Sequence, residues 1–265
     1  HHFAQQLGSP FPLLAAAGAR TSRIELGTAV IDMRYENPLY MAEDAGAADL
    51  ISGGRLQLGI SRGSPEQVSS DADMAREHTK VLLDVLQGEG FAKPTPRPMS
   101  PNPPGLLRVE PYAPGLRERI WWGAGTRATA EWTAQQGMNL MSSTLLTEDT
   151  GVPFHQLQAE QIQRFRDAWR EAGHEHEPRV SVSRSIFPIV SDLDRQFFWR
   201  EQRSTDTVGW LDGGNARFGK TYAGEPDKLI ADLAGDEAIA AADTLLLTVP
   251  NQLGVDYNAH VLHSV

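Results

Sequence analysis

The chain has 265 residues, enough for one large α/β domain, and its formal net charge of −10 argues against a general nucleic-acid surface, because phosphate binding requires clustered positive charge. It contains no cysteine, which excludes disulfides, thiolate metal sites and thiol nucleophiles. No apolar run approaches the roughly 20 residues of a membrane span and no signal peptide opens the chain, so we expect a cytoplasmic protein without membrane contact.

A strongly patterned stretch near the start of the chain predicts a strand, a helix and a second strand. Residues 24–31 form a short apolar run rich in β-branched side chains, which is typical of a strand covered on both faces. Apolar residues then recur at helical spacing over 39–50, and Ser52-Gly53-Gly54 provides small residues that end a helix. Residues 55–60 return as a strand that ends in the polar turn Ser61-Arg62-Gly63, where parallel α/β folds carry their functional groups.

The rest of the chain continues the alternation of helices and strands. Helical spacing predicts helices at 11–19, 73–86, 126–136 and 154–172, with further helices from 223 and from 256. In the helix at 73–86, the predicted inner face is Met74, His78, Val81, Leu82 and Val85. Apolar runs predict four more strands, at 119–125, 138–143, 180–190 and 244–249. Because helices connect these strands, we expect parallel pairing among the six strands of the chain.

Two segments break this pattern, and we expect both to be excursions from a single domain that covers residues 1–265. Residues 93–114 contain eight prolines, a density that forbids regular structure. Residues 192–219 have poor periodicity and carry charged and Gly-Gly stretches, so we expect a mobile excursion there. An eight-stranded barrel would need two strands more than the six predicted, and these would have to precede His1.

Six stretches in chain order carry a family pattern, from HHFxxxxGSPFPLLAAAGARTSRIELGTAV and NPLYMAEDAGAADLISGGRLQLGISRG through WWGAGTRATAEWTAQQGMNLM to SDLDRQFF, YAGEPDKL and TLLLTVPNQLGVDYNAH. Together they resemble the bacterial luciferase-like, flavin-dependent monooxygenase family. The resemblance implies a (β/α)8 TIM barrel that binds a flavin at the C-terminal ends of its strands. It also implies that the first strand, the first helix and most of the second strand lie ahead of His1, and that the interval between Val68 and Asp71 is short for the family. We expect a longer native chain, with a naturally reduced protein as the alternative.

A candidate phosphate site lies where the strand at 119–125 gives way to the next helix. Gly125 and Thr126 form this junction, where free backbone N–H groups and the helix dipole favour an anion. The resemblance implies that the hydroxyls of Thr126 and Thr129 contact the flavin phosphate. Arg62 adds a cation at the end of its own strand. The alternative interpretation of Thr126 is a helix N-cap without a ligand.

The resemblance also implies a surface for the flavin ring. It places a cis peptide bond between two residues that are not proline, Ala29 and Val30, although the sequence alone would make them ordinary strand residues. Ser61 stands where luciferases carry a reactive cysteine beside the flavin. A serine cannot form thiol adducts, so this difference argues against luciferase activity in particular but not against monooxygenation.

His1 and His2 are the candidate catalytic residues, because they match the catalytic histidine of the family and its neighbour. An imidazole titrates near neutrality and can take a proton from the substrate and return it. The alternative interpretation of a histidine pair at the start of a chain is the remnant of a tag. The sequence motif that follows the pair, Phe-x-x-x-x-Gly-Ser-Pro, favours the catalytic role.

These features predict a flavin-dependent monooxygenase that uses reduced FMN and O₂ to oxidise a small organic substrate, with an aldehyde as the first candidate. We expect a separate flavin reductase as a partner, and a homodimer formed through the helices at 10–19 and 39–50. A deazaflavin-dependent dehydrogenase and a non-catalytic flavin-binding protein are the alternatives. The sequence offers no paired metal-ligand spacing and no glycosidase carboxylate pair.

Overall fold

The computed structural model describes residues 8–63, 72–96, 101–102, 104–148, 150–211 and 214–265. The chain forms two compact units, His1–Gly123 and Ala124–Val265. Within the described residues, no helix has the length and apolar character needed to cross a membrane. Our expectation of one domain over the whole chain stays a prediction.

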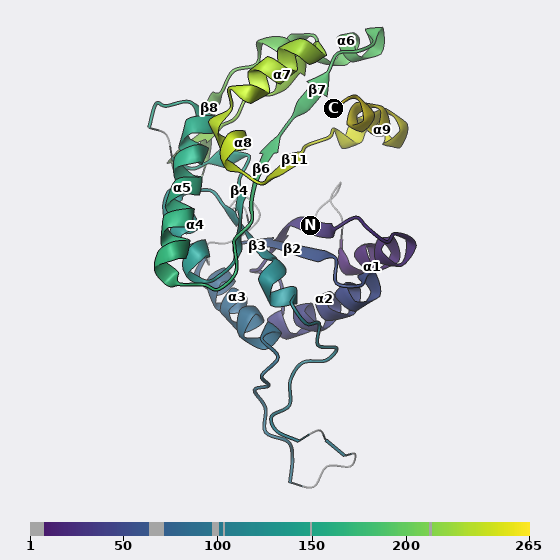
Figure 1. Ribbon diagram of the computed structural model, residues 1–265, viewed down its shortest axis with the longest axis vertical. Helices are drawn as coiled ribbons and strands as arrows, with labels where there is room; N and C mark the ends of the chain where they lie inside the picture. Colours follow the sequence, from purple (N-terminus) through teal and green to yellow (C-terminus); the bar gives the residue numbers. More distant parts are fainter. Residues whose placement is uncertain (1–7, 64–71, 97–100, 103, 149, 212–213) are drawn as a thin grey trace. The chain divides into compact units, whose positions relative to one another are not determined.

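The first unit sets helices beside three parallel strands (Figure 1). In chain order its elements are α1 Phe11–Arg20, β1 Leu26–Asp32, α2 Pro38–Ser52, β2 Leu56–Ser61, α3 Ala72–Leu86, the 3₁₀ turn η2 Leu116–Arg119 and β3 Ile120–Ala124. Strand β2 lies between β1 and β3, with Leu26 opposite Leu56 and Leu58 opposite Ile120. The predicted strand–helix–strand unit with parallel pairing is therefore confirmed.

Strand β1 is more open than its sequence predicts. Along the strand, Thr28 and Val30 are half-buried while Gly27 and Ala29 are exposed, the alternation of a strand with one covered face. Ile24, which lies ahead of the strand, is 56% exposed. The expectation of a strand covered on both faces is wrong here, because a run of small and β-branched residues suits one covered face as well as two.

Helix α2 begins and ends where its sequence signals predict. Asn37 caps it by accepting the N–H groups of Leu39 and Tyr40, and Gly53 closes it in the left-handed conformation with a φ of 70°. Asp49 is buried near its end and binds Arg119 through two hydrogen bonds of 2.6 and 3.0 Å. This pair fixes the helix to the segment that leads into β3.

Helix α3 is present but turned relative to its predicted inner face. The predicted inner residues Met74 and Val81 are exposed. Leu82 is buried as predicted, and the other buried residues of the helix are Ala75, Thr79, Leu83 and Leu86. Small Ala75 and Thr79 carry a weak hydrophobic signal, so the pattern of large apolar residues misplaced the face by part of a turn.

The proline-rich segment between α3 and η2 forms an extended arm with no helix or strand in its described residues (Figure 1). A single antiparallel bridge joins Ala92 to Leu107 across this arm. The peptide bond between Glu110 and Pro111 is cis. An irregular excursion was predicted for residues 93–114, and the structure agrees.

The second unit contains three parallel strands, a two-stranded parallel pair and a three-stranded antiparallel sheet. Its strands are β4 Asn139–Ser142, β5 Leu145–Leu146, β6 Val180–Arg184, β7 Ile186–Pro188, β8 Thr207–Leu211, β9 Gly214–Phe218, β10 Tyr222–Gly224 and β11 Thr244–Leu247. Its helices are α4 Arg127–Gln135, α5 Phe154–Ala172, α6 Asp192–Phe198, α7 Pro226–Ala234, α8 Glu237–Ala241 and α9 Val255–Ser264, with 3₁₀ turns η3 Arg200–Arg203 and η4 Asn251–Leu253. Strand β6 lies between β4 and β11 in the parallel group.

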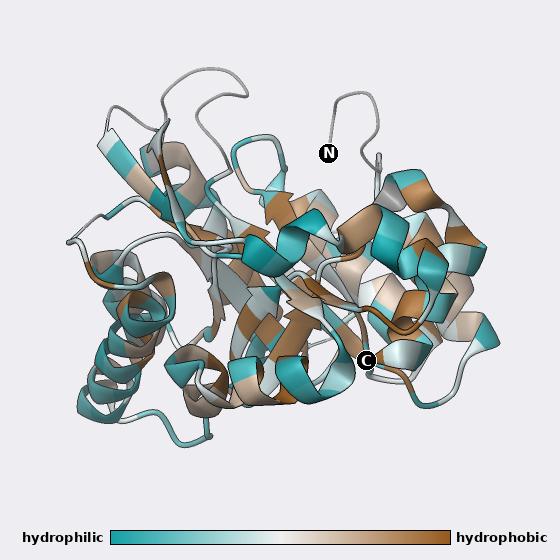
Figure 2. Cartoon of the chain, turned by 90° about the horizontal axis from the view of Figure 1, so that it is seen from above, coloured by the Kyte–Doolittle hydropathy of each residue, from teal (hydrophilic) through white to brown (hydrophobic). Residues whose placement is uncertain are grey.

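Helix α5 illustrates how amphipathic spacing builds this unit. Its buried face includes Leu157, Ile162, Phe165 and Trp169, and it packs against α4 and α8. Figure 2 shows the same division in colour, with brown strands beside helices that carry long teal stretches. The predicted bounds of this helix, 154–172, agree with the structure.

Several short elements of the second unit escaped prediction. The segment 192–219 holds α6, β8 and β9, although its poor periodicity predicted an irregular excursion. The strand predicted at 180–190 is divided into β6 and β7, and α8 was missed. Elements of three to seven residues are too short for a periodic signal to emerge. The parallel α/β class is confirmed, while a closed eight-stranded barrel stays a prediction.

Candidate active site

The predicted site residues form two groups, one in each unit. Ala29, Val30, Ser61 and Arg62 belong to the first unit, at β1 and at the end of β2. Gly125, Thr126 and Thr129 belong to the second unit, at the start of α4. The predicted catalytic pair, His1 and His2, lies outside the described residues.

The peptide bond between Ala29 and Val30 is cis, as predicted. The pairing register of β1 with β2 shifts between Thr28 and Ile31, so the two strands are locally irregular at this bond. Thr28 Oγ1 donates a 2.7 Å hydrogen bond to the carbonyl of Gly59 and ties the strands together just ahead of the irregularity.

Side chains from three neighbouring strands meet next to this bond. A Cβ atom placed on Gly123 would lie 3.4 Å from Ser61 Cβ and 3.5 Å from Val30 Cγ1. Ser61 is buried, and its hydroxyl accepts the N–H of Gly63 at 3.0 Å, whereas Arg62 is exposed. Val30, Ser61 and Gly123 therefore make a small, uncharged surface, which we call the neutral patch.

A buried ion pair lies beside the neutral patch, and the sequence did not single it out. Asp32 is opposite Ser61 in the strand register and binds Arg34 at 2.6 Å, with both side chains less than a tenth exposed. Gly63 closes over this pair with a φ of 72°, and a Cβ atom there would lie 1.9 Å from Asp32 Oδ2. Only glycine fits at this position. The available signal was a charged residue at the end of an apolar strand.

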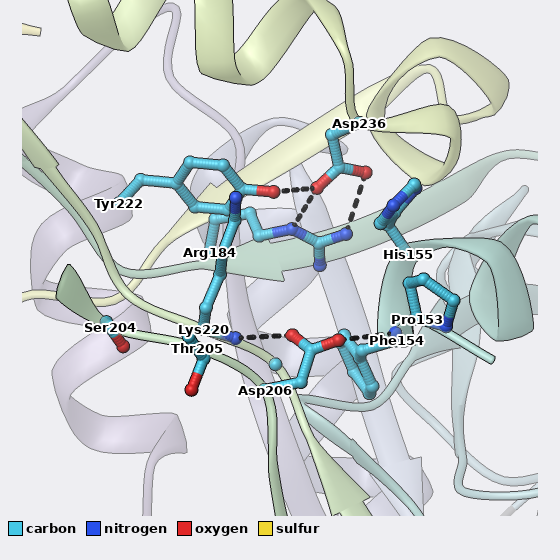
Figure 3. A pocket seen from close by; sticks show the side chains of 11 residues that line it. Pro153, Phe154, His155, Arg184, Ser204, Thr205, Asp206, Lys220, Tyr222 and Asp236 are labelled. Carbon is cyan, nitrogen blue, oxygen red and sulfur yellow. Dashed lines mark hydrogen bonds and ion pairs between the residues drawn. The ribbon is translucent and has the colours of Figure 1, made fainter. Parts of the chain in front are cut away.

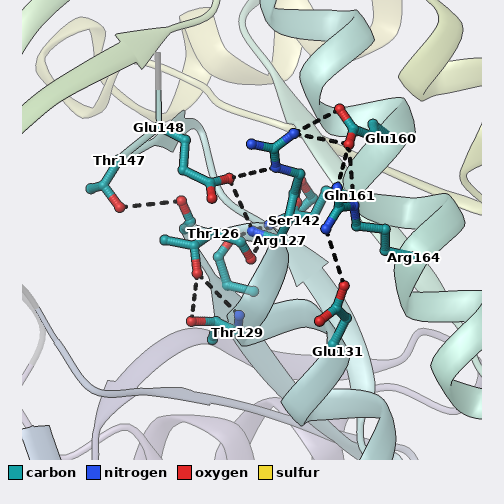
Figure 4. Close-up of polar contacts among 12 residues, drawn as sticks. Thr126, Arg127, Thr129, Glu131, Ser142, Thr147, Glu148, Glu160, Gln161 and Arg164 are labelled. Atoms are coloured by element: carbon teal, nitrogen blue, oxygen red, sulfur yellow. Dashed lines mark hydrogen bonds and ion pairs between the residues drawn. The ribbon is translucent and has the colours of Figure 1, made fainter. Parts of the chain in front are cut away.

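In the second unit, Thr126 caps α4. Its Oγ1 accepts the N–H of Thr129 at 3.0 Å and donates to Thr129 Oγ1 at 2.8 Å (Figure 4). The capping role considered for Thr126 is therefore confirmed. In the part of the chain that the structure describes, no acceptor takes the N–H of Ala128 or the hydroxyl proton of Thr129. These two groups are donors available to an anion.

A carboxylate that the sequence did not predict shares this turn. Glu148 Oε2 accepts both the backbone N–H and the Nε–H of Arg127 at 3.1 Å (Figure 4). Arg127 also binds both oxygens of Glu160 at 2.9 Å, and this hydrogen bonding lowers the pKa of the Glu160 carboxyl. Arg127 is thus neutralised by its own neighbours, and an anion bound at this turn depends on the hydroxyls and on the free amide.

The turn is held in place by buried amides of α5. Gln161 Nε2 donates to the carbonyls of Thr126 at 2.9 Å and Ala124 at 3.2 Å, while its Oε1 accepts from Ser142 Oγ at 2.6 Å. The carbonyl of Gly125 accepts the N–H of Thr147 at 2.9 Å. The available sequence signal for Gln161 was a polar residue on the apolar face of a helix.

Each group, taken by itself, suits a different chemical feature of a ligand. The neutral patch can lie against an aromatic ring, since it carries no charge and little bulk. The Thr129 hydroxyl and the free amide at the start of α4 can donate to a phosphate. A flavin mononucleotide contains both features, a ring and a phosphate. Among the described residues, no cluster of three or more histidine or carboxylate side chains could hold a metal ion.

Comparisons with known proteins point to the same family as the sequence motifs. A family model described as luciferase-like monooxygenase matches residues 1–245. The chain is 24% identical over 209 residues to the oxygenase component of the flavin-dependent trigonelline monooxygenase of Acinetobacter baylyi, covering 71% of this chain and 52% of the relative. It is 24% identical over 186 residues to an alkanal monooxygenase alpha chain of Photorhabdus laumondii, covering 66% and 49%. The chain thus spans about half the length of these relatives.

Solved structures agree on the fold. Monooxygenase RslO1 of Streptomyces bottropensis superposes with a TM-score of 0.72 at 20% identity, covering 99% of this chain and 83% of that one. The oxygenating constituent of 3,6-diketocamphane monooxygenase of Pseudomonas putida, in complex with FMN, gives 0.55 at 19% identity and covers 76% and 60%. An F420-dependent secondary alcohol dehydrogenase gives 0.64 at 14% identity and covers 100% and 85%.

Proposed function

We propose that the chain oxidises a small organic substrate with O₂ and reduced FMN. The proposal starts from the fact that the chain belongs to the luciferase-like monooxygenase family, whose model matches residues 1–245. The observation that carries this proposal is the set of unused donors at the start of α4, the Thr129 hydroxyl and the Ala128 amide, which suit the phosphate that distinguishes FMN from its parent flavin. The neutral patch of the other unit supports it with a surface suited to the ring.

The cofactor would supply the activation of O₂, and the protein would supply binding and proton control. Thr129 would bind the phosphate with its hydroxyl, next to Gly125, and Thr126 would orient that hydroxyl through its own hydrogen bond. Arg62 would contribute positive charge. Ala29, Val30 and Ser61 would contact the ring.

Proton handling is assigned to His1, with His2 beside it. A neutral imidazole would accept a proton from the substrate at a ring nitrogen and return it later in the cycle. This assignment rests on the sequence resemblance alone.

The partners and the substrate class follow from what relatives are named for. The trigonelline relative is named an oxygenase component, which supports a separate flavin reductase as the source of reduced FMN. The Photorhabdus relative is named an alkanal monooxygenase, which supports an aldehyde as the first substrate to test. The camphane enzyme was solved with FMN, which supports FMN as the cofactor.

A second candidate function is hydride transfer with a deazaflavin. The specific observation in its favour is the fold similarity to the F420-dependent secondary alcohol dehydrogenase, which covers the whole of this chain. A deazaflavin dehydrogenase would reduce or oxidise its substrate without consuming O₂. A third candidate is a flavin-binding protein without catalytic activity.

Oxygen uptake separates the three candidates. The purified chain is mixed with reduced FMN and a saturated medium-chain aldehyde, and O₂ consumption and carboxylic acid formation are followed together. The monooxygenase account expects acid formation that requires both reduced FMN and O₂. Acid formation with oxidised deazaflavin under nitrogen would instead favour the dehydrogenase. Flavin binding without any product would favour the binding protein.

We also propose a cytoplasmic homodimer that forms through α1 and α2. These helices expose several large apolar side chains, namely Leu13, Tyr40, Leu50 and Ile51. An exposed apolar surface of this kind is typical of a protein interface. Light scattering coupled to size-exclusion chromatography should give twice the chain mass, and the substitution Leu50→Glu should reduce it to the monomer mass.

A further inference from the structure

A polar pocket lies within the second unit. It has a volume of about 230 Å³ and opens among the start of α5, the end of β6, residues 204–206 and residues 219–222 (Figure 3). None of the residues predicted to bind flavin lines it. The pocket therefore needs its own explanation.

The back wall of the pocket is a buried ion pair. Arg184 at the end of β6 binds Asp236 through two hydrogen bonds of 2.7 and 3.0 Å, with side chains that are 3% and 0% exposed. Tyr222 donates its hydroxyl to Asp236 at 2.6 Å. The backbone N–H groups of Ala238 and Ile239 add two further hydrogen bonds of 3.0 Å. Asp236 thus has no acceptor capacity left for a ligand.

The second carboxylate of the pocket, Asp206, is also occupied. Its Oδ2 accepts the N–H of Phe154, the first residue of α5, at 2.7 Å. Its Oδ1 accepts the N–H of Lys220 at 3.1 Å. Asp236 is therefore saturated, while each oxygen of Asp206 accepts one hydrogen bond and keeps one acceptor site. The pocket thus retains few acceptors for a ligand.

Donors, in contrast, remain available. Within the described residues, the Lys220 ammonium makes no ion pair and lies 4.6 Å from the centre of the Tyr222 ring. His155 accepts the N–H of Glu237 at its Nδ1, so in the neutral ring the proton is on Nε2. Ser204 Oγ accepts the N–H of Thr221 and keeps its own proton to donate.

Arg184 contributes further unused donors. A guanidinium has five N–H bonds, of which two go to Asp236 and one to the carbonyl of Ser183 at 2.9 Å. No acceptor among the described residues takes the other two. Figure 3 shows one terminal nitrogen of Arg184 directed away from Asp236.

We infer that this pocket binds a small oxyanion, a carboxylate or a phosphate, through Lys220, Arg184 and the Nε2–H of His155. Asp236 is saturated, and the unused donors of Lys220, Arg184 and His155 outnumber the acceptor sites left on Asp206, which favours an anion over a cation or a neutral amide. The site is distinct from the flavin residues and does not depend on the proposed oxidation.

Calorimetric titration of the full chain tests this inference with three probes of similar size. Inorganic phosphate and acetate should bind, and acetamide, which has the shape of acetate without its charge, should not. Phosphate binding alone identifies free phosphate as the source of the anion, and acetate binding alone identifies a carboxylate. The inference is wrong if neither anion binds, or if acetamide binds as well as acetate.

Substitutions of single residues test where the anion binds. The substitution Lys220→Met should weaken binding about tenfold or more, the typical loss of a charged hydrogen bond, while the matched control Lys80→Met on α3 should leave it unchanged. Binding lost in Thr129→Val and kept in Lys220→Met would move the anion to the start of α4 and overturn the assignment. His155→Leu gives an independent test should Lys220→Met fail to fold, and unchanged affinity in it would contradict the inference.

Discussion

Two arginine–carboxylate clusters in the second unit use the same chemistry at very different depths. At the start of α4, Arg127 is 20% exposed and its partner Glu160 is 43% exposed. At the end of β6, Arg184 and Asp236 are almost fully buried. Water competes for the first pair and is excluded from the second, so the first contributes little to stability whereas the second cannot lose one partner without leaving a buried charge.

The difference also separates two kinds of binding site. At the α4 turn, the unused donors are a hydroxyl and a backbone amide that come from one helix start. In the pocket beside Arg184, the donors are side chains brought together from α5, β6 and the segment that follows β9. Local sequence can therefore encode the first site, and only the tertiary fold can assemble the second.

The largest expected effect comes from removing one arginine of each cluster. Arg184→Met should destabilise the protein by about 3–5 kcal/mol, because Asp236 would remain charged and buried. Arg127→Met should cost about 0–1 kcal/mol, the usual value for an exposed pair. Urea unfolding followed by circular dichroism measures both. Equal losses in the two variants would show that burial is not what distinguishes the clusters.

The next effect concerns the amide that holds the α4 turn. Gln161→Met keeps the shape of the side chain but leaves the carbonyls of Ala124 and Thr126 without their donor, at a cost of about 1–3 kcal/mol. Gln163→Met is the control, because Gln163 is exposed on the same helix, and it should change stability by less than about 0.5 kcal/mol. The same unfolding experiment compares them, and a neutral Gln161→Met would mean that the turn is held by other contacts.

A smaller effect is expected on cofactor affinity. Thr129→Val removes one hydroxyl at the start of α4 and should weaken FMN binding about tenfold. Thr133→Val is matched in size on the same helix, where the Thr133 hydroxyl donates to the backbone carbonyl of Thr129 at 2.8 Å. It should leave the affinity unchanged. Quenching of FMN fluorescence gives both dissociation constants. Equal dissociation constants for the two variants would show that the Thr129 hydroxyl does not bind the phosphate.

The smallest effect is on the pH dependence of stability. Burial raises the pKa of Asp236, but hydrogen bonds from Arg184 and Tyr222 outweigh it and hold that pKa below its ordinary value. Because the folded pKa is lower than the unfolded one, this stabilisation is present above the unfolded pKa of about 3.9 and is lost as the pH falls through the folded pKa.

Asp236→Asn should flatten the stability profile in that acidic range. The pKa of Glu160 is lowered as well, chiefly by its hydrogen bond to Arg127, but solvent screens this pair. Glu160→Gln should therefore leave the profile nearly unchanged. Thermal unfolding between pH 2 and 6 compares the two variants. A larger change of the stability profile in Glu160→Gln than in Asp236→Asn would contradict the account.

Much of the fold could be predicted from sequence wherever one element is long or clearly capped. The parallel strands β1, β2, β3, β4 and β11, α2 with Asn37 and Gly53 at its ends, and the bounds of α5 agree with local patterns. Short elements such as α8 and the β8–β9 hairpin could not be predicted, since a few residues carry no period. The inner face of α3 was misplaced because two of its buried residues are small.

The candidate site divides in the same way. Thr126 and Thr129 are local to one helix start, and their capping geometry follows from three-residue spacing. Glu148 lies 21 positions from Arg127, and Asp236 lies 52 positions from Arg184. No local pattern links residues so far apart in the chain, so these contacts became visible only in the fold.

The affinity for reduced FMN relative to reduced riboflavin tests the central claim most directly, since riboflavin has the same ring without the phosphate. Anaerobic titration of the full chain measures both affinities. If the start of α4 binds the phosphate, FMN should bind at least about tenfold more tightly than riboflavin, and Thr126→Val with Thr129→Val should abolish this preference. Equal affinities for the two flavins in the unmodified chain would contradict the account.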